Sequence, residues 1–453
     1  MRQGFETIVN NAFVGFGFPS DSPVNITFPS EMFNTGSDLT PFEEGFQLLL
    51  SGLTDWEPKP VEDDAAEAKL IDFTGTSYPE VYAQVQHHFM RNSWSDSLPI
   101  VPPTEEYVNW ILRGTDEDPN TVVGSVPPRN GICTVRNIAI LLAMAGGRPE
   151  YLPFMIAAVK CAVDPKAAMQ NWNATTNSVF PVFVVNGPER MNLRLGSGYG
   201  CLGPDPAHPA GQVMGRAIRL LQQVMGGAIP GVGTMALYGA NRATNAFFAE
   251  DEEGIPETWT SWAEDRGYSR DKNVVTMTIA LGAANAIWTY GTAAKNLTAL
   301  NMMAATLRQP DRNRYSQGAN YKEDNDDYAS GVVFINRDVA AHLVADNGMS
   351  KLDVKKYLWE NSFTTYEDLE SWGSLGAVKN SYPDIKAGDS IPVCPKPEVL
   401  TIVIAGGDQG GHGYYMGGID QGNVVSNEVK LPACWDDLLI DAAIDLGAAP
   451  AMH

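Results

Sequence analysis

The sequence predicts an α/β protein whose mixed or parallel sheets are flanked by helices. Three observations support this fold class: strand-like and helix-like segments alternate, 44% of the 453 residues are hydrophobic, and no repeat of fixed period occurs. Strands that alternate with helices are typical of α/β folds. A chain of this length can also bury a substantial core.

The first 69 residues predict an incomplete small unit followed by a connection. Residues 1–55 have the pattern of a helix, a short strand and a second helix, which begins after Thr40 with Pro41 in its first turn. This is an α/β unit without its beginning. Residues 56–69 are acidic, polar and contain proline, so we expect a linker there.

From residue 70 onward, helices and strands alternate in one main domain, residues 70–395, on which a C-terminal segment, residues 396–453, is expected to pack. Thr134 is placed to cap a helix, and Ser350 and Asp353 have the spacing of a capping box. The expected helices lie at 134–147, 148–165, 211–227, 296–308 and within 336–362, and the expected strands at 179–187, 273–280, 331–335, 399–407 and 423–431.

Charge and composition exclude several classes of protein. Lys and Arg number 31 against 54 Asp and Glu, a formal net charge of -23, so nucleic acid and anionic membranes would be repelled. The sequence has no apolar run of about 18 residues and no signal-peptide pattern at its start, which predicts a cytoplasmic protein. The five cysteines show no C-x-x-C spacing, so neither a zinc knuckle nor a disulfide framework is indicated.

A glycine-rich loop with the sequence AGGDQGGHG, residues 405–413, follows an apolar strand and holds the first candidate site. It fails the dinucleotide fingerprint because Asp408 stands where glycine is required, so no dinucleotide is predicted. Gly407 and Gly410 would let the backbone approach a ligand at the carboxyl end of the strand. We expect His412 to act as general acid/base and Asp408 to orient it; the alternative is a flexible exposed loop.

Four adjacent carboxylates, Glu250 to Glu253, form the second candidate site. Four in a row cannot all face inward, so we expect most of them to be solvated. In extended backbone Glu250 and Glu252 point the same way and could raise each other's pKa or bind a hard cation. Glu250 is therefore a candidate catalytic carboxylate and Glu252 a candidate substrate ligand, while a solvated acidic turn is the alternative.

Two polar segments, NWNATTNS at 171–178 and SGYGCLGP at 197–204, are further candidates. The first can hydrogen-bond a polar substrate or form a turn. The second contains Cys201, the cysteine in a glycine-rich setting, which we expect to be the most accessible thiol, although packing without chemistry is the alternative. Cys201 is the candidate catalytic residue, and the candidate substrate-binding residues here are Asn173, Asn177, Ser197 and Tyr199.

The other cysteines and the histidines give weaker signals. Cys133 directly precedes a predicted helix, whose N-terminus would lower the pKa of its thiol, whereas Cys161 lies in an apolar helix and is expected in the core. No histidine has metal-ligand spacing such as H-E-x-x-H. A divalent metal held by residues distant in the sequence is left open.

An ordered series of segments between about residues 90 and 430 resembles the UGSC-motif family, named for a Cys or selenocysteine followed by Gly-Ser-Cys. The series includes DSLPIVPPTEEYV, VVGSVPPRNGICTVRNIAILLAMAGGRPEYLPFMIAAV, NATTNSVFPVFVVNGP, SGYGCLGP, FFAEDEEGIP, NGMSKLDVKKYLWE and VIAGGDQGGHG. The resemblance implies that Thr175 and Thr176 line a site. It also implies that residues 1–55 are the second half of the small domain that carries the motif, although no C-G-S-C occurs in this chain.

Three functions remain open at this point. In the first, the chain is the large subunit of a thiol- or selenol-dependent redox enzyme acting on a small polar molecule, and residues 1–55 dock a small motif-bearing subunit. In the second, it is a non-redox hydratase, hydrolase or lyase using the same acid/base residues, with or without a metal, in a homo-oligomer. In the third, it binds a small molecule without turnover.

Overall fold

The computed structural model describes residues 70–239, 246–287, 297–308, 322–379, 381–409 and 411–449, together with Gln47. The expectations for residues 1–55 and 56–69 and for Gly410 lie outside these residues. Within them the fold is α/β, with mixed sheets packed against helices, as the sequence predicted. No helix of the described ranges is long and apolar enough to cross a membrane.

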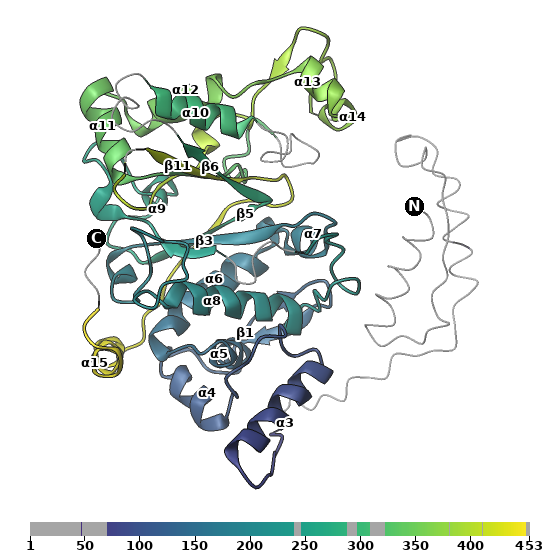
Figure 1. Ribbon diagram of the computed structural model, residues 1–453, viewed down its shortest axis with the longest axis vertical. Helices are drawn as coiled ribbons and strands as arrows, with labels where there is room; N and C mark the ends of the chain where they lie inside the picture. Colours follow the sequence, from purple (N-terminus) through teal and green to yellow (C-terminus); the bar gives the residue numbers. More distant parts are fainter. Residues whose placement is uncertain are drawn as a thin grey trace.

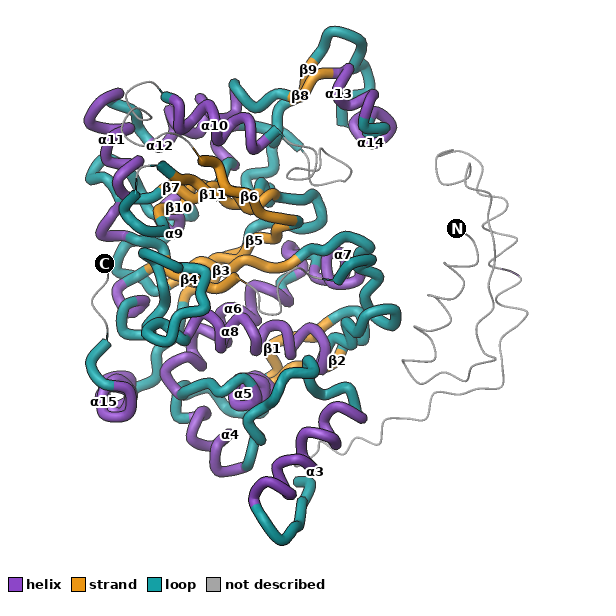
Figure 2. Tube along the Cα trace, viewed as in Figure 1, coloured by secondary structure: helices purple, strands orange, loops and turns teal. Residues whose placement is uncertain are grey.

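The described residues form two four-stranded sheets that face each other, with helices on the outer side of each, so that four layers are stacked (Figures 1 and 2). The eight strands are β3 Phe180–Asn186, β4 Ala246–Ala249, β5 Val274–Ala280, β6 Gly282–Ile287, β7 Gly331–Ile335, β10 Ile402–Ile404, β11 His412–Gly417 and β12 Val425–Glu428. Sheet one has the order β12-β5-β3-β4, and sheet two has the order β10-β7-β11-β6.

Helices cover both outer faces, and short elements connect them. The helices on the side of sheet one are α3 Tyr78–Arg91, α4 Glu105–Leu112, α5 Val135–Met144, α6 Leu152–Val163 and α8 Ala210–Leu220, and those on the side of sheet two are α10 Thr298–Leu307, α11 Arg337–Asn347 and α12 Lys351–Glu360. The other α-helices of the described residues are α7 Met169–Ala174, α9 Trp262–Asp265, α13 Tyr366–Ser371, α14 Leu375–Val378 and α15 Trp435–Leu446. Two antiparallel pairs complete the described strands: β1 Val122–Val126 with β2 Gly131–Thr134, and β8 Thr364–Thr365 with β9 Ser390–Ile391.

Local sequence explains where the main helices begin. Thr134 accepts a hydrogen bond from the Asn137 backbone and completes a capping box at the start of α5. Ser350 and Asp353 form the predicted capping box at the start of α12. Each box satisfies backbone N–H groups that have no partner within the helix, so both helix starts were predictable from the sequence.

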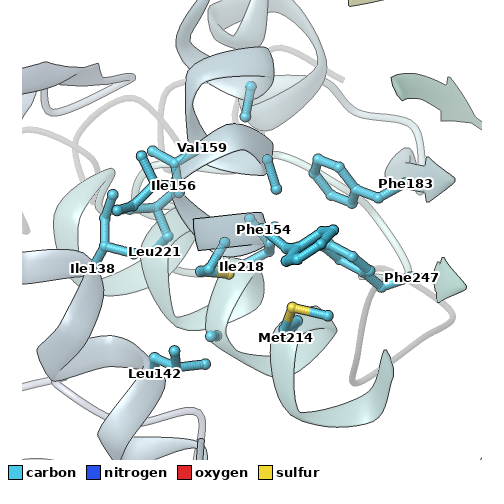
Figure 3. Close-up of a cluster of buried hydrophobic side chains, with 14 of the residues drawn as sticks. Ile138, Leu142, Phe154, Ile156, Val159, Phe183, Met214, Ile218, Leu221 and Phe247 are labelled. Atoms are coloured by element: carbon cyan, nitrogen blue, oxygen red, sulfur yellow. The ribbon is translucent and has the colours of Figure 1, made fainter. Parts of the chain in front are cut away.

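Each layer boundary is filled by its own apolar cluster. Between sheet one and α5, α6 and α8, side chains such as Phe154, Phe183 and Phe247 pack together (Figure 3), and the rings of Phe183 and Phe247 are stacked with centroids 5.1 Å apart. A second cluster lies between sheet two and its helices. A third, including Phe248 and Phe334, lies between the two sheets. Burial on this scale is the main stabilising contribution to such a fold.

The two sheets have the same topology. In sheet one β3 and β4 are parallel and β5 pairs antiparallel on the other side of β3; β7, β10 and β11 repeat this arrangement in sheet two. The backbone N–H of Glu250 donates to Val185 and that of Ala405 to Ile335, both at 3.1 Å. Glu250 and Ala405 therefore occupy corresponding positions. The repeat is one of topology, which explains why no fixed period was found in the sequence.

The fourth strand of each sheet is exchanged between the two units. β6 follows β5 in the chain but pairs with β11 in sheet two, and β12 follows β11 but pairs with β5 in sheet one. Residues 396–449 thus contribute β10 and β11 to one sheet and β12 to the other. His412, expected within a loop, is instead the first residue of β11.

Candidate functional site

A cavity of about 250 Å³ opens at the carboxyl ends of β7 and β10, where the inner face of sheet two meets the loop at 199–202. This edge is where α/β sheets commonly place ligands. Its lining residues are Tyr199, Cys201, Leu202, Asn285, Phe334, Asn336, Ala405, Gly406, Gly407, Gln409, His412, Gly413 and Tyr414.

The floor of the cavity is the inner face of sheet two. Tyr414 pairs with Phe334 on one side and with Asn285 on the other, so these three residues form one row across the sheet. The rings of Phe334 and Tyr414 meet edge to face with centroids 5.6 Å apart. His412 lies two residues before Tyr414 and therefore on the same face of β11. The floor combines aromatic rings, a carboxamide and an imidazole.

Asn336 fixes the glycine-rich loop to the start of α11. Its Oδ1 accepts from the backbone N–H of Val339 at 2.9 Å, which caps the helix, and its Nδ2 donates to the carbonyl of Gln409 at 2.5 Å. Both ends of this buried carboxamide are therefore used within the protein. Asn336 shapes the cavity wall and leaves little bonding capacity for a ligand.

Tyr199 packs against the glycine-rich loop from the opposite side. Its hydroxyl donates to Oδ1 of Asp408 at 2.7 Å, and the N–H of Gly406 donates to the carbonyl of Ser197 at 2.8 Å. A Cβ atom at Gly407 would lie 2.1 Å from a ring carbon of Tyr199, so only glycine permits this approach. The two glycine-rich segments predicted as separate candidates thus meet at one site.

The expected pair of Asp408 and His412 does not form. Among the described residues no hydrogen bond or ion pair joins them, and the carboxylate of Asp408 accepts from Tyr199 instead. His412 is exposed at the cavity, and Cys201 lines the same cavity from the other segment. The structure therefore brings together His412, Cys201, Tyr199 and Gly407 of the predicted site residues.

Glu250 lies outside the cavity lining and is completely buried. Its carboxylate accepts from Asn186 Nδ2 and the Trp262 N–H, both at 2.7 Å, and from the Ile404 N–H at 3.3 Å. Burial raises the pKa of Glu250 because desolvation disfavours the charged form. Since Ile404 belongs to sheet two and Asn186 to sheet one, this carboxyl joins the carboxyl ends of the two sheets.

The other carboxylates of the acidic run are paired with arginines. Asp251 is buried and receives two hydrogen bonds from Arg337, at 2.6 and 2.8 Å; Glu252 is 9% exposed and lies 3.5 Å from Arg190, which also bonds the 56%-exposed Glu253. The expectation that most of the run is solvated was wrong. Two arginines supply the opposite charge that makes burial tolerable, and their positions could not be read from the run itself.

Glu250 and Glu252 do point the same way, as alternation predicted. Asn186 Nδ2 donates to both of them, at 2.7 and 3.0 Å, and the Gly187 N–H also donates to Glu252 at 2.7 Å. Both carboxylates therefore bind the side-chain amide of Asn186 and do not face the cavity. The aspartate between them faces Arg337 on the other side.

The candidate residues at 173–177 lie at the opposite end of the sheets. They precede the start of β3, and Thr175 Oγ1 accepts from Gln421, which follows the end of β11. Asn173 is buried between the carbonyl of Pro127 and Gln222, while Thr175 also accepts from the N–H of Asn177. The Thr176 carbonyl accepts from Leu237. This polar group is not brought to the cavity.

The four other cysteines lie in surroundings that differ from those of Cys201. Burial raises the thiol pKa of Cys133 and of Cys161 to about 12, so the expected lowering at Cys133 was wrong: its side chain is in the core, where desolvation outweighs the nearby helix start. Cys394 is buried as well, with its pKa raised for the same reason. Cys434 is partly exposed and donates to the carbonyl of Arg113.

Neither a search for metal-binding groups nor comparison with known proteins assigns a function to this site. In the described part of the chain, no three or more His, Cys, Asp and Glu side chains are grouped so that they could hold a metal ion. No family model matches the chain, and no match was found among curated proteins or solved structures.

Sequence reasoning missed most of the cavity floor. Phe334 and Asn336 lie in segments that had been assigned to a strand and a helix start, and Tyr414 directly follows the segment that had been assigned to a loop. The alternation of His412, Tyr414 and Met416 could have indicated a strand with one inward face. Asn285 had no such signal, because β6 consists mainly of small residues.

Proposed function

We propose that this chain is an enzyme that acts on a small polar molecule, with Cys201 as the reactive thiol and His412 as its acid/base partner. One observation supports this proposal above the others: the two residues, far apart in the sequence, line one cavity. The four other cysteines lie outside its lining.

The chemistry follows from the two groups. A thiolate is the nucleophilic form of cysteine, and a neighbouring imidazole can accept the thiol proton and later return it to a leaving group. In this proposal the sulfur of Cys201 bonds to an electrophilic carbon of the substrate, the bond from that carbon to its leaving group breaks, and His412 carries the thiol proton to the leaving group. Asp408 contributes indirectly, since its bond to Tyr199 holds the loop that carries Cys201 against the glycine-rich loop.

The redox form of this proposal requires a second sulfur. Cys201 is the one cysteine among the described lining residues, so a disulfide or selenenyl-sulfide step would need a thiol or selenol from a second chain. The family resemblance supports such a subunit. Native mass spectrometry of the protein from its own source would detect it, and a homo-oligomer would leave the non-redox form of the proposal.

The direct test is the reactivity of each cysteine toward iodoacetamide, followed by peptide mass spectrometry from pH 5 to pH 9. We expect Cys201 to react at least about ten-fold faster than Cys434 at pH 7, as a thiol pKa lowered by one unit would produce. His412→Gln should remove most of this difference, since the imidazole can no longer accept the proton.

The control is His342→Gln, which changes a half-exposed histidine on α11 that bonds Asp346. It should leave the rate at Cys201 unchanged. A Cys201 rate equal to that of Cys434, and insensitive to His412→Gln, would contradict the proposal.

A further inference from the structure

We infer that the ligand of this cavity is a neutral, flat molecule with a carboxamide-type edge, in which a donor and an acceptor lie side by side. The inference deepens the proposed function, because it assigns a chemical class to the substrate of the same site. It follows from the charge, the unused hydrogen-bonding groups and the aromatic surfaces of the cavity.

The charge of the cavity does not suit an ion. None of the described lining residues is Asp, Glu, Lys or Arg. Of the charged groups on the loop and the following helix, Asp408 lies outside the lining and binds Tyr199 through Oδ1, and Arg337 is paired with the buried Asp251. A charged ligand would therefore lose its hydration without gaining a fixed counter-charge. The net charge of -23 further disfavours an anion.

Two carboxamides at the cavity are available to a ligand. Asn285 and Gln409 both line it, and no hydrogen bond joins the side-chain carboxamide of either one to another described residue, in contrast to Asn336. Each carries an N–H donor beside a carbonyl acceptor. A ligand with the same two groups in one plane, such as an amide, urea or lactam, can satisfy both at once.

The remaining surface is aromatic and small. Phe334 and Tyr414 form the floor and Tyr199 the wall, and flat apolar rings are favourable partners for such surfaces. A cavity of about 250 Å³ has the volume of roughly eight water molecules in the liquid. The ligand is therefore about the size of one substituted ring.

The test compares three probes that share one ring and differ in charge: benzamide, benzoate and benzamidine. Each is added at millimolar concentration to the whole protein, and binding is followed by saturation-transfer NMR and by protection of Cys201 against iodoacetamide. We expect benzamide to bind and protect, and the two ions to do neither. Cys434 serves as the internal control, since its alkylation should not change.

Asn285→Ala should weaken benzamide binding about three- to ten-fold, the loss expected for one hydrogen bond. The matched control is Asn361→Ala, which removes an exposed carboxamide that bonds within its own helix end. Equal or stronger binding of benzoate or benzamidine, no binding of benzamide, or binding that Asn285→Ala leaves unchanged would each overturn the inference.

The NMR readout separates this inference from the proposed function. Selective benzamide binding in a protein whose Cys201 is no more reactive than Cys434 would keep the ligand class and refute the thiol chemistry. A reactive Cys201 in a protein that binds no neutral probe would do the reverse.

Discussion

The loops that follow β4 in sheet one and β10 in sheet two occupy corresponding positions, but one holds a buried carboxyl group and the other borders an open cavity. After β4 the chain places Glu250 between the sheets, where its carboxyl accepts from both of them. After β10 the corresponding residue is Ala405, which lines the cavity. The corresponding edge of sheet one is thus a structural contact, in which Glu250 links the two sheets and which we call the joint. In sheet two the same edge is an open cavity.

This difference shows that an unusual sequence motif can serve either the structure of the protein or a binding site. The inward-facing carboxylates of the acidic run are buried, and each of them accepts hydrogen bonds from an N–H donor or from an arginine. The glycine-rich loop is conspicuous because it leaves space, against the ring of Tyr199 on one side and for the cavity on the other. Charge in a sequence run does not indicate a site until its partners are known.

The largest expected effect is loss of the joint. Glu250→Ala should lower the free energy of unfolding by about 3–5 kcal/mol, because it leaves buried N–H donors without an acceptor and opens a void between the sheets. Urea denaturation followed by tryptophan fluorescence measures this. The cavity should still bind its neutral probe in the folded fraction, since Glu250 does not line it.

Glu253→Ala is the matched control from the same run. Its side chain is 56% exposed, so the ion pair with Arg190 is worth less than about 1 kcal/mol. If Glu250→Ala were as stable as this control and instead abolished probe binding, the acidic run would be part of the site and the comparison would fail.

A second, intermediate effect is expected in the open loop. Gly407→Ala places a Cβ against the ring of Tyr199, and such overpacking costs about 1–3 kcal/mol. Displacing the ring should also break its bond to Asp408 and expose Cys201, so iodoacetamide should react faster there.

Gly376→Ala is the control for this change, because Gly376 lies in α14 with no neighbour near the added atom. It should leave stability unchanged or raise it by up to about 1 kcal/mol, because alanine is the better helix former. An unchanged stability and an unchanged Cys201 rate in Gly407→Ala would show that Tyr199 does not rest on the loop.

Sequence patterns predicted the layers far better than the site. The strand containing Phe183 and the helices capped by Thr134 and Ser350 follow from local apolar periodicity and caps, which a single segment carries. β4 and β6 were missed because they are short, and β6 is built from small residues with weak strand preference. α15 was not predicted at all.

The site depends on contacts between distant segments. Cys201 and His412 were both identified as candidates, but their shared cavity follows from the pairing of β11 with β7 and from the contact of Tyr199 with Gly407. Asp408 was paired with His412, whereas its carboxylate accepts a hydrogen bond from Tyr199. No single stretch contains the information that Arg190 and Arg337 neutralise the acidic run.

The last effect comes from the smallest chemical change, the loss of one proton from Glu250, and makes stability depend on pH. Glu250 has a pKa above its ordinary value of 4.5 because it is buried, so the folded protein binds its proton more tightly than the unfolded chain does. Stability from this group is therefore complete below about pH 4.5 and decreases as pH rises toward the folded pKa, by up to about 1.4 kcal/mol per pH unit. The loop at 405–409 has no buried carboxyl at the corresponding position and should contribute no such term.

Glu250→Gln isolates this contribution, because glutamine has nearly the same shape and cannot ionise. Its stability relative to the unchanged protein should rise between pH 4.5 and 8, measured by urea denaturation of both proteins in the same buffers. The difference cancels the titration of all other groups, including Glu253, whose pKa is lowered and whose contribution therefore has the opposite sign. A difference that stays flat or falls with pH would mean that Asn186, Trp262 and Ile404 stabilise the ionised carboxylate fully. The joint would then be a charged centre, as polar as the arginine pairs beside it, and the contrast between the two loops would be one of charge and not only of space.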